Sequence, residues 1–329
     1  MVPNRASGKK GHEGNNGMKI LVLGAGAVGG YFGGRLAEAG ADVTFLVRPT
    51  RAELLAKNGL RISSRAGDVA LRPKCMVAEQ VKPDYDIVLF TAKAYDLASA
   101  IDAVAPAMVG KRGHVLPLLN GMSHLGLLDA RFGRERVLGG VAYIASTLSP
   151  DGEIKHLNEF HRVAFGPRHA LQKAVCESFA AASAGAKSDF KLTDAIEQAM
   201  WDKWVLLATL AGITCLMRAP VGDIVATASG GALTLALLGE NAAVAQAEGF
   251  PTPEAVLANY RGLLTQKGSA FSASMLRDVE SGGRAEGDHI LGALLAIARK
   301  HSVATPVLEI AATHLEAYAA RRAREASGK

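Results

Sequence analysis

A glycine-rich turn between an apolar strand and a helix constrains this chain more than any other segment. Residues 24–30 read Gly-Ala-Gly-Ala-Val-Gly-Gly, and they follow the apolar run 19–23 and precede a helical pattern that extends to residue 40. The first glycine permits a tight turn, the second lets the backbone approach a phosphate, and the third lets the helix pack close to the strand. Free N–H groups at the start of such a helix face the anion.

This pattern predicts a site for a dinucleotide pyrophosphate. The residues expected to bind it are Gly24, Gly26, Ala27, Val28 and Gly29. The alternative is a glycine-rich turn that only packs a helix, and the second strand predicted at 42–47 argues against that alternative.

The end of the second strand indicates which dinucleotide binds. An NAD site usually carries Asp or Glu there to bind the ribose 2′-hydroxyl. Here the strand runs into Arg48 and Arg51, and no acid stands between them. A guanidinium group matches a 2′-phosphate bidentately, so Arg48 predicts NADP (NADPH) as the cofactor. The alternative is that both arginines are solvated loop charges.

Length and charge bound the class of protein. A chain of 329 residues predicts about two domains. The net charge of +6 belongs mainly to the ends, since residues 1–17 carry +2 and residues 319–329 carry +3. The body is therefore nearly neutral, which gives no support for a nucleic-acid partner.

Cysteine use and hydropathy point to a cytoplasmic protein. Cys75, Cys176 and Cys215 are widely spaced and form no CxxC pair, as expected in a reducing compartment. The first 17 residues contain no apolar segment of a secretory signal, and we expect them to be a disordered extension. The longest uncharged stretch of the central apolar region, 204–217, is too short to span a bilayer, so no membrane partner is predicted.

The order of strand and helix patterns predicts the architecture. Residues 18–190 alternate the two patterns, which indicates a parallel sheet with crossover helices. The later strands are expected at 86–91, 114–119 and 136–143, with shorter ones at 154–157 and 163–165 around the turn 149–152, and a helix at 171–182. From 191 to 329 helical patterns take over, at 193–218, 229–249, 253–267, 284–301 and 306–324.

The predicted fold class is therefore α/β, with an N-terminal Rossmann-type, doubly wound parallel sheet followed by an all-helical C-terminal domain. We assign residues 18–190 to an NADP-binding domain and residues 191–329 to a domain for substrate binding and dimerisation. The apolar helix surface of the second domain favours a homodimer. In such pairs of domains the ligand usually lies between them, at the carboxyl ends of the strands.

Two polar residues follow strand ends that would face the nicotinamide half of the cofactor. Lys93 comes after the strand 86–91, and Asn120 comes after the strand 114–119. Each has an ordinary structural alternative. Lys93 could simply begin a surface helix, and Asn120 with Gly121 could form a tight turn, because Asn-Gly is a favoured turn dipeptide.

Lys203 is the most conspicuous polar residue of the helical region. It lies in Met-Trp-Asp-Lys-Trp and is followed only by uncharged residues as far as Met217. A lysine on the apolar side of a helix is costly unless it is paired or functional, and burial lowers its pKa. Such a lysine suits a general acid for a ketone. The alternative is a lysine whose ammonium reaches solvent at the helix edge.

Ser274 and Glu286 form a further pair of polar candidates. Composition alone predicts Ser274 as a helix cap and Glu286 as an acid in the first turn of a helix. The histidines show no metal-ligand spacing, and we predict no metal.

Taken in order, these motifs resemble the ketopantoate reductase (2-dehydropantoate 2-reductase) family over residues 18–318. The resemblance rests on the glycine loop, Lys93 in Thr-Ala-Lys-Ala, Leu-Leu-Asn120-Gly-Met, Met-Trp-Asp-Lys203-Trp, and Ser274-Met-Leu-Arg-Asp followed by Glu286. It implies an oxidoreductase that uses NADPH to reduce ketopantoate to pantoate, a step of pantothenate and coenzyme A biosynthesis.

The same resemblance implies roles for individual residues. Lys203 would be the general acid, and Glu286 would pair with Lys203 or with the cofactor ribose. Lys93 and Asn120 would line the cofactor and substrate side of the site, and Ser274 would bind the substrate carboxylate.

This chain departs from the family pattern at two positions. The family usually carries asparagines one and two helical turns after the lysine, where this chain has Leu207 and Ala211. A substrate hydroxyl or carboxylate would lose hydrogen-bond partners there. These departures leave two alternatives open: a relative that reduces a bulkier or less polar 2-oxo acid or carbonyl compound, and a non-catalytic NADP-binding sensor. A dehydrogenase of the 3-hydroxy acid or opine type is a further alternative, and the spacing of Ser274 and Glu286 argues against it.

Overall fold

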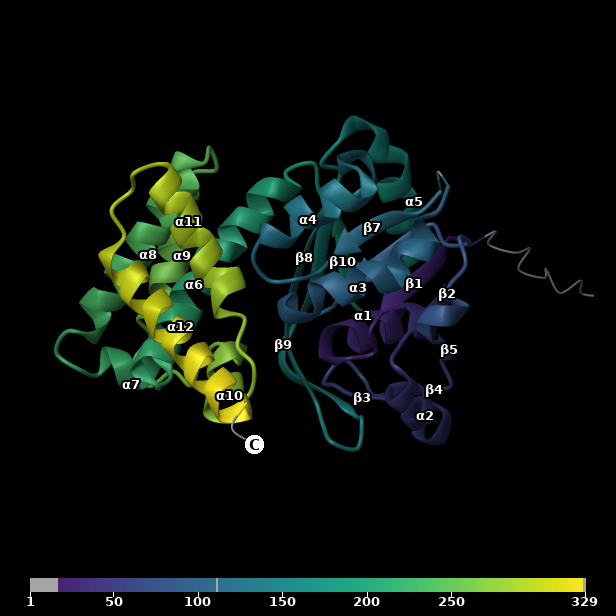
Figure 1. Ribbon diagram of the computed structural model, residues 1–329, viewed down its shortest axis with the longest axis horizontal. Helices are drawn as coiled ribbons and strands as arrows, with labels where there is room; N and C mark the ends of the chain where they lie inside the picture. The colour runs from purple at the N-terminus through teal and green to yellow at the C-terminus, as the bar shows by residue number, and fades with distance from the viewer. Residues whose placement is uncertain (1–16, 111, 328–329) are drawn as a thin grey trace, which may run out of the picture.

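The computed structural model describes residues 17–110 and 112–327. Two bodies lie side by side, an α/β domain and a helical domain, and the long helix α6 runs from one into the other (Figure 1). The expected architecture is confirmed. The extension predicted at residues 1–17 falls almost entirely outside the described residues.

A five-stranded parallel sheet forms the centre of the α/β domain, in the order β5-β2-β1-β6-β7. Its strands are β1 (Lys19–Leu23), β2 (Asp42–Leu46), β5 (Lys74–Met76), β6 (Ile87–Phe90) and β7 (His114–Pro117). Ile20 and Val22 of β1 belong to one apolar core, and Leu21 and Leu23 belong to another on the opposite face. Burial on both faces explains why these strands read as continuous apolar runs.

Helices cover the two faces of this sheet. They are α1 (Ala27–Glu38), α2 (Pro49–Asn58), α3 (Leu97–Val104) and α4 (Ser123–Phe132), while α5 (Lys173–Ser183) packs on a second sheet of the same domain. Short 3₁₀ turns occur at Ala78–Gln80, Ala94–Asp96, Ala105–Met108, Arg134–Arg136 and Ala170–Gln172. Because β2 and β6 lie on either side of β1, the chain reverses its winding direction at the carboxyl end of β1, which is where ligands of such folds bind.

A second, mixed sheet corrects part of the sequence-based prediction. It contains β3 (Leu60–Ser63), β4 (Val69–Leu71), β8 (Gly139–Leu148), β9 (Ile154–Gly166) and β10 (Asp189–Leu192). The run 136–143 thus belongs mostly to β8, antiparallel to β9, and only Val137 bridges to the parallel sheet. The two short strands expected at 154–157 and 163–165 are one strand. Periodicity within a short run cannot reveal which partner strand it will meet.

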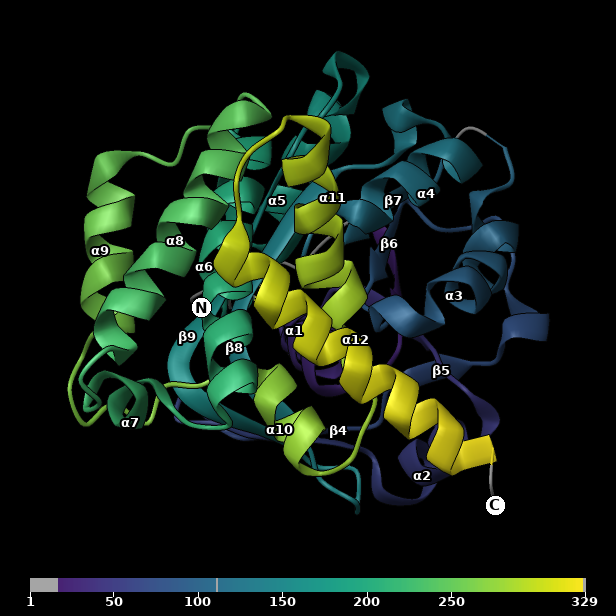
Figure 2. The same cartoon turned by 60° about the vertical axis from the view of Figure 1, so that its left-hand side comes forward.

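The helical domain follows β10. Its helices are α6 (Ile196–Met217), α7 (Val221–Val225), α8 (Gly230–Ala247), α9 (Glu254–Leu264), α10 (Ser274–Glu280), α11 (Ala293–Lys300) and α12 (Pro306–Ser327), with a π-helical turn at Asp288–Gly292 before α11. Figure 2 shows α12 crossing the domain diagonally, and its buried residues end at Tyr318. The helix predicted from 284 begins later than expected, at residue 287, and Glu286 just before it accepts a hydrogen bond from the N–H of Ala94 in the other domain.

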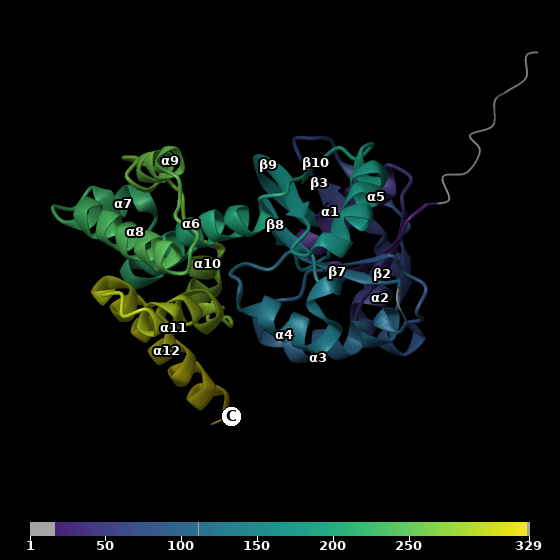
Figure 3. The same ribbon diagram turned by 90° about the horizontal axis from the view of Figure 1, so that it is seen from above.

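The central helix of this domain is α6, which packs on α8, α10 and α12 (Figure 3). Among the described helices it alone is long and apolar enough to cross a bilayer, and 67% of its most apolar window is buried inside the protein. Its apolar composition is therefore explained by its place in the core of the domain.

Candidate active site

The glycine loop joins β1 to α1 at the carboxyl end of the parallel sheet. Gly24 has φ +93°, which favours glycine. A Cβ on Gly29 would collide with the Thr91 side chain and the carbonyl of Gly24, whereas a Cβ on Gly26 would meet nothing within 4 Å. Gly29 is thus required for packing of the helix on the strand, while the open space at Gly26 fits a ligand that approaches the backbone.

Side chains bind two backbone carbonyl groups where β1 passes into this loop. Thr91 Oγ1 donates to the carbonyl of Leu23 at 2.6 Å, and Arg51 Nη2 donates to that of Ala25 at 2.8 Å. The N-terminus of α1 has no side-chain cap and no acid in its first turn. Unsatisfied N–H groups and the helix dipole therefore remain for an anion, as a dinucleotide pyrophosphate requires.

The two arginines after β2 have different environments. Arg51 is turned towards the loop backbone, and burial lowers its pKa. Arg48 stands at the N-terminus of α2, its side chain 77% exposed, and forms an ion pair of 2.8 Å with Asp96. Of these two arginines Arg48 thus has the exposed guanidinium group, and a carboxylate contacts it.

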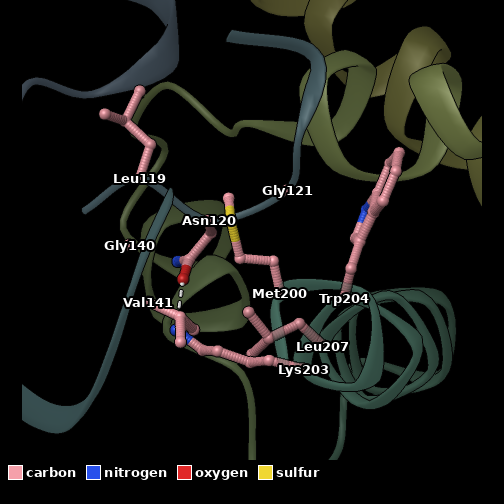
Figure 4. A pocket seen from close by; sticks show the side chains of 9 residues that line it. All are labelled: Leu119, Asn120, Gly121, Gly140, Val141, Met200, Lys203, Trp204 and Leu207. Carbon is pink, nitrogen blue, oxygen red and sulfur yellow. Dashed lines mark hydrogen bonds between the residues drawn. The ribbon is translucent and has the colours of Figure 1, made fainter. Parts of the chain in front are cut away.

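Lys203 lies in a small pocket between the two domains (Figure 4). Its Nζ donates to Asn120 Oδ1 at 3.0 Å and to the carbonyl of Ala142. The ring of Tyr143 lies 5.5 Å from the ammonium group. The lining residues are Leu119, Asn120, Gly121, Gly140, Val141, Met200, Lys203, Trp204 and Leu207. The structure thus brings Lys203 together with Asn120, which lie 83 positions apart in the chain.

Burial lowers the pKa of Lys203 to about 8. Its hydrogen-bond acceptors, an amide oxygen and a backbone carbonyl, are neutral, so neither restores the charged form as a carboxylate would. An ammonium group has three N–H donors, and two are used here. The third is available to an oxygen atom in the pocket.

Lys93 and Glu286 form a separate cluster between the domains. Lys93 Nζ lies 3.1 Å from Glu286 Oε2 and 3.5 Å from Asp278 Oδ2, and Glu286 also accepts from the N–H of Ala94 at 2.8 Å. Burial would lower the pKa of Lys93, but Glu286 and Asp278 outweigh it and raise that pKa. Glu286 therefore contacts Lys93 and the N–H of Ala94 in this structure rather than Lys203.

Ser274 and the two departures from the family pattern take different positions. Ser274 is the first residue of α10 and exposed, while Ala273 is the N-cap, so the predicted capping role is wrong. Leu207 lines the Lys203 pocket, whereas Ala211 is 3% exposed and belongs to the core of the helical domain. Leu207 is thus the departure that shapes this pocket.

Several site residues carried no signal that the sequence reasoning used. The Ala142 carbonyl is backbone, and only the tertiary fold places it beside Lys203. Asp278 and Thr91 did stand within the segments singled out above, and their acid and hydroxyl side chains were the available signal.

In the described ranges no group of three or more His, Cys, Asp or Glu side chains could hold a metal ion.

Family models match both parts of the chain. The model "Ketopantoate reductase PanE/ApbA" matches residues 20–169, and "Ketopantoate reductase PanE/ApbA C terminal" matches residues 195–319. The chain belongs to the ketopantoate reductase family. It is therefore an oxidoreductase of a nicotinamide-dependent family, as the resemblance of its motifs implied.

The names of the proteins that this chain resembles state different activities. "Uncharacterized oxidoreductase YkpB" of Bacillus subtilis is 40% identical over 305 residues, covering 93% of this chain and all of that one. The solved 2-dehydropantoate 2-reductase of Geobacter metallireducens is 30% identical, with a TM-score of 0.83 over 91% of this chain and 99% of its own. D-mandelate dehydrogenase, solved with NADH and anilino(oxo)acetate, has a TM-score of 0.82 over 93% and 99% at 20% identity, a likeness of fold alone.

Proposed function

We propose that this ketopantoate reductase family member reduces a 2-oxo acid with NADPH and that Lys203 is its general acid. The observation that carries the proposal is the contrast between the two lysines of the site. Lys203 contacts only neutral acceptors and has its pKa lowered to about 8, while Lys93 faces two carboxylates that raise its pKa. A proton donor for reactions near neutral pH needs a pKa close to the working pH.

The residues of the pocket would act as follows. NADPH, when bound, supplies the hydride that reaches the keto carbon. Negative charge then develops on the keto oxygen, and the free N–H of Lys203 donates to that oxygen and transfers its proton. Asn120 Oδ1 and the Ala142 carbonyl hold the ammonium in place. The product is the 2-hydroxy acid, and Lys203 is left neutral until solvent protonates it again.

The residues around the glycine loop fit the cofactor. The pyrophosphate would bind at Gly24, Gly26, Ala27, Val28 and Gly29, beside the Leu23 and Ala25 carbonyls that Thr91 and Arg51 bind. Arg48 would meet the 2′-phosphate of NADPH. Lys93, kept charged by Glu286 and Asp278, would face the cofactor side of the site, and Ser274 would bind the substrate carboxylate.

The substrate class follows from Leu207. This side chain lines the pocket together with Leu119, Val141, Met200 and Trp204, so most of the side chains that line the pocket with Lys203 are apolar. Ketopantoate carries a hydroxyl group that would have no asparagine partner at Leu207. A buried polar group without a partner costs about 1–3 kcal/mol. We therefore expect a 2-oxo acid with a bulkier or less polar side chain to compete with ketopantoate as the substrate.

Two measurements test the proposal. Steady-state oxidation of NADPH with ketopantoate and with a series of 2-oxo acids of increasing hydrophobicity gives the substrate class. Efficient turnover of ketopantoate with a low KM would overturn the preference for apolar side chains. Lys203→Met should lower kcat by about 10²- to 10⁴-fold and leave the Kd for NADPH within about twofold of the parent.

The matched control is Lys187→Met, because Lys187 is exposed and pairs with Glu38 far from the pocket. It should leave both kcat and Kd unchanged. If the parent protein binds NADPH but turns over none of the 2-oxo acids, the chain is a non-catalytic NADP-binding sensor and the proposed activity is wrong.

A further inference from the structure

Asp96 forms an ion pair with Arg48, the arginine that would bind a 2′-phosphate. Asp96 Oδ2 lies 2.8 Å from Arg48 Nη2. Arg48 follows β2, and Asp96 ends the 3₁₀ turn that follows β6. Since β2 and β6 flank β1, the ion pair reaches across the carboxyl end of β1, where the glycine loop begins. The pair therefore bridges the two sides of the predicted cofactor crevice.

The position of this carboxylate is fixed from the helical domain. Arg284 Nη1 lies 3.6 Å from Asp96 Oδ1, the oxygen that does not face Arg48. The Arg284 guanidinium also stacks 4.0 Å from the centre of the Tyr95 ring and donates to the carbonyl of Tyr95. Asp96 is thus held between two guanidinium groups, with its side chain 29% exposed and open to a ligand.

An acid at the end of the second strand is the usual partner of the ribose 2′-hydroxyl in NAD sites, and this chain has none there. Asp96 brings a carboxylate to the same place from the end of another strand. It can accept a hydrogen bond from a ribose hydroxyl, while Arg48 can bind a phosphate. The two groups favour different cofactors, and they contact each other.

We infer that Asp96 is a specificity-determining residue: it reduces the selectivity for NADPH over NADH and lets this enzyme bind NADH as well. A 2′-phosphate must displace Asp96 from Arg48 and then lie close to a negative charge. The 2′-hydroxyl of NADH meets no such repulsion and finds an acceptor in Asp96. The inference rests on the proposed function, since it assumes that the crevice binds a nicotinamide dinucleotide.

The test is direct titration of the full-length protein with NADPH and with NADH, without substrate, by calorimetry. Asp96→Ala should move the two affinities in opposite directions. The Kd for NADPH should fall about three- to tenfold, because the competing charge is gone, and the Kd for NADH should rise by a similar factor, because a hydrogen bond is lost. Equal shifts of both values, or no shift, would overturn the inference.

A double-mutant cycle shows whether the effect acts through Arg48. Arg48→Gln should weaken NADPH binding and leave NADH binding within about twofold of the parent. In Arg48→Gln/Asp96→Ala the gain for NADPH should be much smaller than in the single variant. A gain of the same size in both backgrounds would show that Asp96 does not compete for Arg48, and would overturn the inference.

Asp189→Asn is the control, since Asp189 pairs with Arg162 on the second sheet and both side chains are about half exposed. It should change neither affinity. If the parent protein binds neither dinucleotide, the proposed function fails. If both bind and the affinities of Asp96→Ala are unchanged, only the role of Asp96 fails.

Discussion

At the scale of single residues, two lysines with the same intrinsic chemistry are given different properties by their neighbours. Lys203 loses solvent and gains only neutral acceptors, so its ammonium form is disfavoured. Lys93 loses solvent as well, but Glu286 and Asp278 favour its ammonium form. The first can exchange a proton near neutral pH, and the second remains a fixed positive charge.

The pH dependence of catalysis should therefore follow Lys203. Only its protonated form can donate, so log kcat/KM for reduction should be level below pH 8 and fall with a slope of −1 above about pH 8. Oxidation of the hydroxy acid needs the neutral amine and should rise through the same pH. A profile measured in both directions checks this, and a reduction rate that stays level to pH 10 would contradict it.

The side chain at position 207 should select the substrate. Leu207→Asn places a polar partner one helical turn after Lys203. The ratio of kcat/KM for ketopantoate to that for an apolar 2-oxo acid should rise about tenfold or more, because sites built on hydrogen bonds discriminate strongly. Leu206→Asn, one position away and outside the pocket lining, is the control and should leave the ratio unchanged.

At the scale of elements, the β1–loop–α1 unit separates packing from ligand binding. Gly29 faces Thr91 and the carbonyl of Gly24, so it lets α1 approach the sheet. Gly26 has extended backbone angles that other residues adopt, and space lies in front of it. Gly29 is therefore required by the fold, whereas we expect Gly26 to be required by the ligand.

Substituting these two glycines should separate the roles. Gly29→Ala should lower the free energy of unfolding by about 1–3 kcal/mol through overpacking and should weaken NADPH binding as well. Gly26→Ala should leave the melting temperature nearly unchanged and raise the Kd for NADPH about tenfold or more, because the methyl group occupies the space of the pyrophosphate. Thermal melts and NADPH titrations of both variants check this; the reverse pattern would contradict it.

At the scale of the whole molecule, the site is assembled by contacts between the domains. Lys203 of α6 reaches Asn120 and the Ala142 carbonyl of the α/β domain, and Glu286 reaches Lys93 and Ala94. Activity should therefore depend on how the domains meet as well as on the residues that touch the ligands.

Glu286→Ala should reveal this dependence. Glu286 is 8% exposed, and its loss leaves the N–H of Ala94 without its partner and removes one of the two acids beside Lys93. We expect a loss of about 1–3 kcal/mol in the free energy of unfolding together with a lower kcat/KM. Glu248→Ala is the control, because Glu248 pairs with Lys300 and His301 inside the helical domain. It should lower stability slightly and leave kcat/KM unchanged.

Local patterns predicted most of the fold and several members of the site. The glycine loop, the apolar strands 86–91 and 114–119, and the change to helices near residue 191 are signals that lie within short segments. The strands at 136–143, 154–157 and 163–165 were wrongly expected in the parallel sheet. Instead β8 and β9 pair as an antiparallel hairpin in a second sheet, because no local pattern specifies which strand pairs with which. The contact of Glu286 with Lys93 joins residues 193 positions apart, beyond the reach of any local pattern.

The sequence by itself determined the dinucleotide loop, the two-domain α/β and helical architecture, and the lysine that stands alone in an apolar helix, because each depends on the order of neighbouring residues. Only the tertiary structure decided which carboxylates lie beside which cations. Glu286 and Asp278 lie beside Lys93 and raise its pKa, whereas burial lowers the pKa of Lys203. Asp96 forms an ion pair with Arg48. Electrostatic interactions fall off with distance through space, so a charge acts on the groups the fold places near it, whatever their separation along the chain.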